Sequence, residues 1–142
     1  MTEITRLTRT QIEAAIRAGV LRVFPRATSI AVFGSFARRG AYHDIDVLVI
    51  VPRLAQPPAQ RAQHILAISG EVALACPLDV LLISEQECRD NFAAHVPLFL
   101  SIACDGRALY DTGLIRPLIA RTRRYIRAQR IQRTDRGGWQ FP

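Results

Sequence analysis

The chain has 142 residues, 49% of them hydrophobic, and a formal net charge of +7. Its length and apolar content predict one compact domain over residues 1–142 with a buried core. No run of about 18 apolar residues occurs, so we expect neither a transmembrane helix nor a membrane partner. The first residues are polar and periodic, unlike a signal peptide. These features predict a cytoplasmic protein.

Cysteine usage favours the same compartment. The three cysteines, Cys76, Cys88 and Cys104, are odd in number and lack the spacing of metal ligands. Each has apolar neighbours, as is usual for a reduced thiol inside a protein core. We therefore expect three free core thiols and no disulfide bond.

Positive charge is concentrated near the C-terminus, in a basic helix and tail of about residues 112–142. Residues 116–136 contain eight arginines and one acid, Asp135, whereas the other eleven arginines and eleven acids cancel. An arginine-rich helix face is most often simply solvated, and the alternatives are a nucleic acid or an acidic protein partner. Few aromatic residues precede Trp139, so bases would have little to stack on. The chain has no lysine, which excludes a lysine nucleophile and a P-loop lysine.

Hydrophobic periodicity, prolines and glycines predict the order of the secondary-structure elements. We expect helices over residues 8–23, 36–39, 58–74, 97–103 and 112–130, and one that opens with a capping box at residues 84–87. We expect strands over residues 29–33, 45–51, 77–83 and 107–110, the last at a sheet edge. Residues 45–51 are apolar on both faces after their opening acids, which is typical of a central strand covered on both sides. The sequence thus predicts an α/β (α+β) fold.

Two of these helices carry a recognisable apolar stripe. In the helix over 58–74 the inward residues should be Ile65, Leu66, Ile68 and Val72. In the last helix they should be Ile115, Ile119, Thr122 and Ile126, with the arginines facing outward. We expect the tail after residue 133 to be rich in turns.

Two carboxylates open the strand over residues 45–51. Asp44 and Asp46 stand two residues apart, so on a strand both would point to the same face. They would repel each other and lose hydration unless a positive charge lay between them, and a divalent cation would supply that charge. Asp79 lies in a later apolar run, where a lone ionised carboxylate is costly. Either its strand pairs with the first and the three carboxylates converge, or Asp79 only caps the turn after Pro77.

Such a cluster would suit magnesium chemistry on phosphates. Carboxylate oxygens are hard ligands that Mg²⁺ prefers, with water and substrate phosphates completing its coordination. Two such ions can stabilise both the attacking and the leaving oxygen of an in-line displacement at phosphorus. The turn at Gly34 and Ser35, just before the short helix, offers backbone N–H groups that could hold phosphate.

Together these residues resemble a known family. Gly34-Ser35, then Asp44-Ile45-Asp46 at the head of an apolar strand, then Asp79 in a later strand are similar to the minimal nucleotidyltransferases of the DNA polymerase beta superfamily. The resemblance covers about residues 10–110. It implies a mixed sheet of about three to five strands, with helices packed behind it and a nucleotide-binding face in front. It also implies transfer of a nucleoside monophosphate, AMP if the donor is ATP, from an NTP to a hydroxyl group.

The resemblance assigns roles by position. Gly34 and Ser35 would hold the triphosphate, and Asp44 and Asp46 would bind the Mg²⁺ ions, two in number. Asp79 would share the second ion and act as the base for the acceptor hydroxyl. Catalysis of this kind rests mostly on positioning and charge neutralisation, which suits a small scaffold.

The loop around these residues departs from the family pattern. Eight residues, 36–43, separate Gly-Ser from the first aspartate, fewer than is usual. His43 replaces the usual serine; it could contact phosphate or the acceptor, or have no role. Arg38 and Arg39 could pair with the nucleotide phosphates, one of them at most pointing inward, or be merely solvated.

Three functions follow for this chain. One is an active, Mg²⁺-dependent nucleotidyltransferase with a protein or small-molecule hydroxyl as acceptor. Another is a non-enzymatic antitoxin that neutralises its partner by contact. The resemblance implies such a protein partner, because many members of this family act as antitoxins that pair with a helical toxin protein and can adenylylate it. The third is a nucleic-acid-binding module that uses the C-terminal arginines. Formation of a homo-oligomer stays open.

Overall fold

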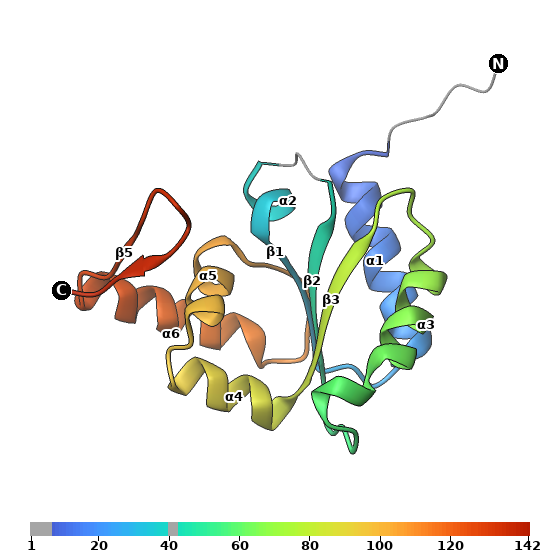
Figure 1. Ribbon diagram of the computed structural model, residues 1–142. Helices are drawn as coiled ribbons and strands as arrows, with labels where there is room; N and C mark the ends of the chain where they lie inside the picture. Colours follow the sequence, from blue (N-terminus) through green and yellow to red (C-terminus); the bar gives the residue numbers. More distant parts are fainter. Residues whose placement is uncertain (1–6, 40–42) are drawn as a thin grey trace.

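The computed structural model describes residues 7–39 and 43–142. In these ranges a four-stranded mixed sheet carries helices on both of its faces (Figure 1), which confirms the α/β (α+β) fold. The helices are α1 (Arg9–Val23), α2 (Gly34–Arg39), α3 (Ala62–Val72), α4 (Glu85–Ala93), α5 (Pro97–Asp105) and α6 (Ile115–Ala128), and the 3-10 helix η1 (Pro58–Gln60) precedes α3. The strands are β1 (Ser29–Phe33), β2 (Ile45–Val51), β3 (Leu78–Ser84) and β4 (Arg107–Asp111), and β5 (Gln132–Arg133) and β6 (Trp139–Gln140) form a separate hairpin.

The strand order is β3-β2-β1-β4. β2 runs parallel to β3, whereas β1 is antiparallel to both β2 and β4. The starts of β2 and β3 therefore lie at the same end of the sheet as the last residue of β1, Phe33, after which α2 begins. Asp44, Asp46 and Asp79, the three predicted site carboxylates, lie at that shared end.

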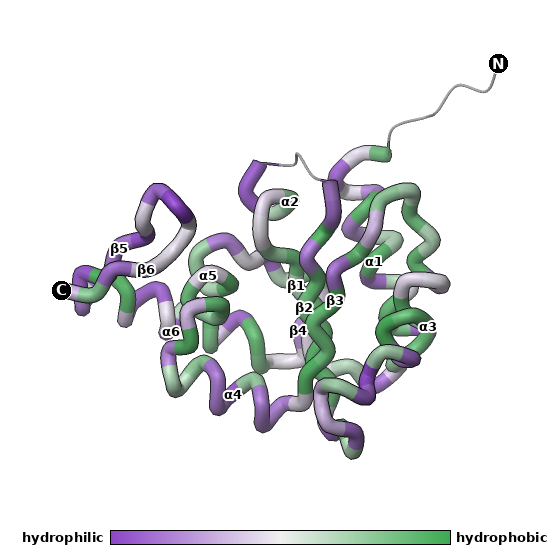
Figure 2. Tube along the Cα trace, viewed as in Figure 1, coloured by the Kyte–Doolittle hydropathy of each residue, from purple (hydrophilic) through white to green (hydrophobic). Residues whose placement is uncertain are grey.

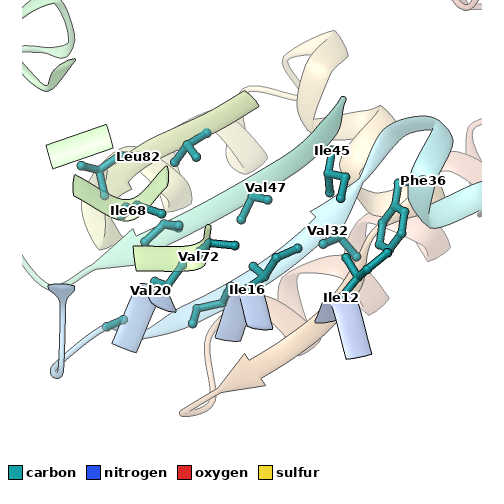
Figure 3. Close-up of a cluster of buried hydrophobic side chains, with 14 of the residues drawn as sticks. Ile12, Ile16, Val20, Val32, Phe36, Ile45, Val47, Ile68, Val72 and Leu82 are labelled. Atoms are coloured by element: carbon teal, nitrogen blue, oxygen red, sulfur yellow. The ribbon is translucent and has the colours of Figure 1, made fainter. Parts of the chain in front are cut away.

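Helices bury both faces of the sheet. α1 and α3 cover one face, where Ile16, Val47 and Ile68 belong to a single buried cluster (Figure 3). α4, α5 and α6 cover the other face, with Leu48, Phe92 and Ile102 in a second cluster. Figure 2 shows the sheet strands largely hydrophobic and the loop between β5 and β6 hydrophilic. Both faces of β2 are therefore covered, as its apolar sequence predicted.

Local sequence explains where two of the helices begin. The Thr8 hydroxyl accepts a hydrogen bond from Gln11 N, and Gln11 Oε1 accepts one from Thr8 N, which forms a capping box before α1. The predicted box before α4 is present, because Ser84 and Glu87 exchange the same two bonds at 3.1 Å each. Side chains thus satisfy backbone N–H groups that lack partners at a helix start.

The segment predicted as a long helix over residues 58–74 is interrupted. η1 ends at Gln60, and α3 spans only Ala62–Val72, after the buried side chain of Arg61. Leu66 is 70% exposed, so its place in the predicted apolar stripe is wrong, whereas Ile68 and Val72 are buried. A helix face is fixed by its packing partners, and residues 65 and 66 differ by about 100° around the axis.

Cysteine environments differ from the expectation of three core thiols. All three cysteines are free, but only Cys88 is buried; Cys76 is half-buried and Cys104 is exposed. The inward residues of α6 are buried as predicted: Ile115, Ile119, Thr122 and Ile126. Across residues 7–39 and 43–142, no helix combines the length and the apolar content that a membrane crossing requires.

Candidate active site

The register of two parallel strands brings the acids together. Asp46 of β2 lies directly opposite Asp79 of β3, and the Ile45 N–H donates a 3.0 Å bond to the Pro77 carbonyl at the start of this pairing. Asp44 immediately precedes β2 and is exposed. The structure therefore brings all three predicted carboxylates to one end of the sheet.

Electrostatics indicate that these three carboxylates interact. Burial of the Asp46 carboxyl group, then the negative charge of Asp79, then that of Asp44, and a hydrogen bond with Asp79 raise the pKa of Asp46 to about 6. Within the described residues none of the three forms an ion pair with an arginine or histidine. The cluster is thus a concentration of uncompensated negative charge.

Gly34 places the turn before α2 against this cluster. Its φ of +71° is a backbone conformation that L side chains rarely adopt, and a Cβ atom at this position would overlap Asp46 Oδ2. Glycine is therefore required both by the turn and by the close approach of the carboxylate. Ser35, the next residue, is half-buried. The turn that the sequence suggested for phosphate is adjacent to the acids suggested for the metal.

Asp79 differs from the sequence expectation in its environment. It is exposed, because β3 is an edge strand that begins at Leu78, so the cost of burying a lone charge does not arise. In the described part of the chain no backbone N–H donates a hydrogen bond to its carboxylate, as one would to a capping residue. The neighbour that it does engage is Asp46.

The donor atoms suit Mg²⁺, although the side chains as placed do not form a closed site. In residues 7–39 and 43–142 no three His, Cys, Asp or Glu side chains are grouped tightly enough to hold one metal ion. Mg²⁺ is commonly held by one or two carboxylates together with substrate phosphates rather than by a cage made only of protein. Burial, and then the charges of Asp79 and Asp44, raise the pKa of Asp46, and hard oxygen donors in such a negative environment fit this cation.

The arginines of α2 have different surroundings. Arg38 Nε lies 3.6 Å from Asp105 Oδ2 at the end of α5, so its side chain is engaged with an acid outside the carboxylate cluster. Arg39 is exposed and has no ion pair with any other described residue. His43 is also exposed. Residues 40–42, the rest of the shortened spacer, lie outside the described residues.

A separate groove of about 450 Å³ lies between α4 and α6. Its lining includes Phe92, Leu118 and Tyr125, together with Arg89 and Arg121. None of the three aspartates belongs to it. Six exposed arginines of α6 and the turn after it have no ion pair among the described residues: Arg116, Arg121, Arg123, Arg124, Arg127 and Arg130. The expectation of an outward arginine face on the last helix holds for these six, whereas Arg133, which follows in β5, is bound to Asp105.

Sequence reasoning missed Asp105 and this groove. Asp105 lies just after the helix predicted over residues 97–103, and no sequence pattern assigned it a role. Its arginine partners, Arg38 and Arg133, lie far from it in sequence, and no local pattern marks such a pairing. The groove depends on the separation of two helices, which periodicity does not specify.

Comparison with known families agrees with this geometry. The family model of the nucleotidyltransferase domain matches residues 14–105. That span contains the Gly34 turn and the three aspartates, and it ends at Asp105. Among curated proteins, none matches the chain significantly.

Several solved structures with a similar fold are toxin–antitoxin complexes. A chain in the crystal structure of a toxin–antitoxin with AMP-PNP is 17% identical, with a TM-score of 0.55, over 83% of this chain and 90% of that one. A chain in the complex of a tri-AMPylated HEPN toxin of Shewanella oneidensis with its MNT antitoxin is 18% identical, with a TM-score of 0.55, over 87% and 91%. A chain in an MntA–HepT complex is 17% identical, with a TM-score of 0.53, over 85% and 90%. At these identities the likeness shows a common fold.

Proposed function

The chain belongs to the nucleotidyltransferase domain family, and on that premise we propose that it transfers AMP from ATP to a hydroxyl group on a partner protein, with Mg²⁺ as cofactor. The observation that carries the proposal is the pairing of Asp46 with Asp79 across β2 and β3, with the Gly34 turn against Asp46. One end of the sheet thus offers places for metal ions and for phosphate side by side. The free thiols and the use of ATP both suit the cytoplasm.

Each site residue has a definite task in this reaction. Asp44, Asp46 and Asp79 would hold the Mg²⁺ ions, and the Gly34 backbone and Ser35 hydroxyl would hold the triphosphate. When bound, the ions would neutralise charge on the phosphate oxygens. Arg39, which is exposed and unpaired among the described residues, is free to turn toward the phosphates.

In the proposed transfer, Asp79 is the base for the attacking hydroxyl group. Asp79 accepts the proton of the attacking hydroxyl, and the hydroxyl oxygen forms a bond to the α-phosphorus. The bond between that phosphorus and the oxygen bridging to the β-phosphate breaks, and pyrophosphate leaves. Because Asp79 is exposed at an edge strand, a hydroxyl on another molecule can reach it.

The surface formed by α4 and α6 suits a protein partner better than a nucleic acid. The groove between α4 and α6 is lined by apolar and aromatic side chains together with two arginines, a composition that protein interfaces favour. The unpaired arginines of α6 add charge complementary to an acidic partner. The structural neighbours that come from toxin–antitoxin complexes support a partner of the toxin type.

Label transfer tests the enzymatic proposal. The protein is incubated with Mg²⁺, cell lysate and ATP labelled at its α-phosphate, and labelled acceptors are separated by gel. Asp44→Asn, Asp46→Asn and Asp79→Asn should each lower transfer by about 100-fold or more. Asp90→Asn on the exposed side of α4 removes the same charge and should leave transfer unchanged. Wild-type transfer by both Asp44→Asn and Asp46→Asn would refute the proposal.

Neutralisation by contact alone is the second candidate, and the apolar groove favours it. In cells that carry the partner, Asp46→Asn would then still protect against toxicity, whereas Leu118→Glu in the groove would not. Loss of protection in Asp46→Asn with partner binding intact would count against contact alone.

A nucleic-acid-binding function has its own test. Binding of the protein to a labelled RNA oligomer should weaken steeply with added salt, and an affinity that does not change with salt would exclude this function.

A further inference from the structure

The carboxylate of Asp105 joins two segments that are distant in sequence. Arg133 of β5 donates two hydrogen bonds to it, Nη1 to Oδ1 at 3.0 Å and Nη2 to Oδ2 at 2.9 Å. Arg38 of α2 approaches Oδ2 with its Nε at 3.6 Å. The Asp105 side chain is only 10% exposed, so solvent screens these contacts less than it screens surface pairs. One shielded acid thus links the C-terminal hairpin to α2.

Contacts of the β5–β6 hairpin with α5 and α6 support the position of Arg133. The Trp139 indole N–H donates a 3.0 Å bond to Ser101 Oγ on α5, and the Arg133 guanidinium lies over the Trp139 ring at 5.1 Å. Ile131, at the start of the hairpin, is buried in a cluster with Leu100 and Ile126. Because Arg133 is held against Trp139, which is itself bound to α5, its two-bond contact orients the Asp105 carboxylate.

α2 depends on such contacts for its position. It has six residues, too few for a helix to be stable without tertiary packing. Phe36 is 1% exposed, and Arg9 donates a hydrogen bond to the Ala37 carbonyl, so the middle of α2 is held against α1 and the sheet. The last turn is held by the contact of Arg38 with Asp105. At its other end α2 begins with Gly34, whose backbone lies against Asp46.

We propose that Asp105 is a positioning residue for α2: backed by Arg133, it anchors Arg38 and so fixes the Gly34-Ser35 turn beside Asp46. Arg38 then acts as an anchor rather than as a phosphate ligand, and the C-terminal hairpin supports the nucleotide site without touching it. The part of this inference that concerns nucleotide affinity rests on the proposed function. The anchoring of α2 does not.

Hydrogen exchange and nucleotide binding test the two parts separately. Exchange of the amides of residues 34–39 is followed by mass spectrometry in the wild type, Asp105→Asn, Arg133→Met and Asp135→Asn. The equilibrium dissociation constant of a fluorescent ATP analogue is measured in the presence of Mg²⁺ for the same proteins. Asp135 is an exposed acid of the hairpin turn without an ion pair among the described residues, so its variant is a control for the change in charge.

Asp105→Asn should speed exchange in α2 and weaken ATP binding by about threefold to tenfold, a smaller factor than the roughly hundredfold loss of rate that a 1 Å misplacement in an active site can cause. Arg133→Met should act in the same direction and more weakly, because Asp105 still faces Arg38. Asp105→Glu should recover part of the loss, and Asp135→Asn should match the wild type. In an Arg38→Met background, Asp105→Asn should add little, because its partner has already been removed.

Several results would overturn the inference. One is unchanged α2 exchange and unchanged ATP affinity in Asp105→Asn, even if its melting temperature falls. Another is an effect of Asp105→Asn that is as large in the Arg38→Met background as in the wild type. If the wild type binds no ATP analogue, the proposed function fails, and the exchange data still decide whether Asp105 anchors α2.

Discussion

Asp46 and Asp79 lie directly opposite each other on the parallel strands β2 and β3, and neither carboxylate is paired with a cation among the described residues. The two carboxylates repel each other in the folded protein, and this repulsion disappears when unfolding separates them. It opposes folding at neutral pH and favours any cation that binds between them. The pairing of these two acids thus weakens the stability of the free protein.

The first prediction concerns pH. Because the pKa of Asp46 rises from 3.8 to about 6 on folding, the folded state binds more protons than the unfolded state between these values. Its contribution to stability is complete below 3.8 and is lost as pH rises through about 6. In metal-free buffer, the melting temperature of the wild type should fall over this window more than that of Asp46→Asn.

Thermal scans at a series of pH values, with EDTA present, measure this difference. Asp90→Asn supplies the control, because it removes an exposed acid remote from the site. Adding Mg²⁺ should raise the melting temperature of the wild type above pH 6 and have little effect on Asp46→Asn. Parallel pH profiles for the wild type and Asp46→Asn would show that Asp46 does not carry this raised pKa.

The second prediction compares two glycines. Gly34→Ala should destabilise the protein by about 1 to 3 kcal/mol, because the new Cβ would overlap Asp46 Oδ2 and the positive φ would be strained. Gly70→Ala is the matched control: it lies within α3, and an added Cβ would meet nothing within 4 Å. Alanine is the better helix former, so this variant should be more stable by up to about 1 kcal/mol.

Urea unfolding of the two glycine variants, followed by circular dichroism, gives both free energies. ATP binding should weaken in Gly34→Ala and remain unchanged in Gly70→Ala. Equal stability of the two variants would mean that Asp46 does not lie against the Gly34 turn.

The third prediction concerns Asp111, which joins the end of β4 to the start of α6. Its Oδ1 accepts a 2.7 Å bond from the Ser29 hydroxyl, and further bonds come from the backbone N–H groups of Gly113 and Leu114. Burial alone would raise the pKa of Asp111, but these hydrogen bonds outweigh burial and lower it to about 2. Its stabilising contribution is therefore complete above 3.8 and is lost as pH falls toward 2.

Asp111→Ala should cost about 2 kcal/mol at neutral pH, since it removes a helix cap and leaves buried donors without a partner. Asp135→Asn should be neutral in the same urea titration. The difference between the wild type and Asp111→Ala should narrow below pH 3.8, where the carboxylate begins to be protonated in the unfolded chain. A difference that grows on acidification would contradict the lowered pKa.

Local patterns made part of this site predictable. Asp44 and Asp46 two residues apart at the head of an apolar run, and a capping box at Ser84, are signals carried by neighbouring residues. The pairing of Asp46 with Asp79 was conditional on strand register, which the sequence constrains only through the apolar residues around each acid. That geometry required the structure.

Long-range contacts account for most of what sequence reasoning missed. The link between Arg38, Asp105 and Arg133 depends on how α2, α5 and the hairpin meet, and each residue alone looks like a solvated charge. The exposure of Cys104 and Leu66 likewise follows from which helix face finds a partner. Periodicity defines a stripe, and packing decides its edges.

The last prediction concerns Arg61, which separates η1 from α3. Its side chain is 5% exposed, and it donates to the Leu82 carbonyl at 2.9 Å and pairs with Glu87 Oε1 at 2.9 Å. Arg61→Met should lower the free energy of unfolding by about 3 kcal/mol, because it leaves a buried carbonyl and an acid without their partner. The free energy of unfolding of Arg61→Lys should lie between those of the wild type and Arg61→Met, because an ammonium group cannot reproduce the planar set of hydrogen bonds.

Arg53→Met is the control, because Arg53 is exposed and has no ion pair in the described part of the chain; its effect should stay within about 0.5 kcal/mol. Removing Arg61 should also raise the pKa of Glu87. Burial tends to raise that pKa, and the hydrogen bond from Arg61 helps to lower it. An NMR titration of Glu87 in Arg61→Met measures this shift. If Arg61→Met unfolds at the wild-type urea concentration, packing alone must hold the start of α3, and the paired guanidinium contributes no net stability there.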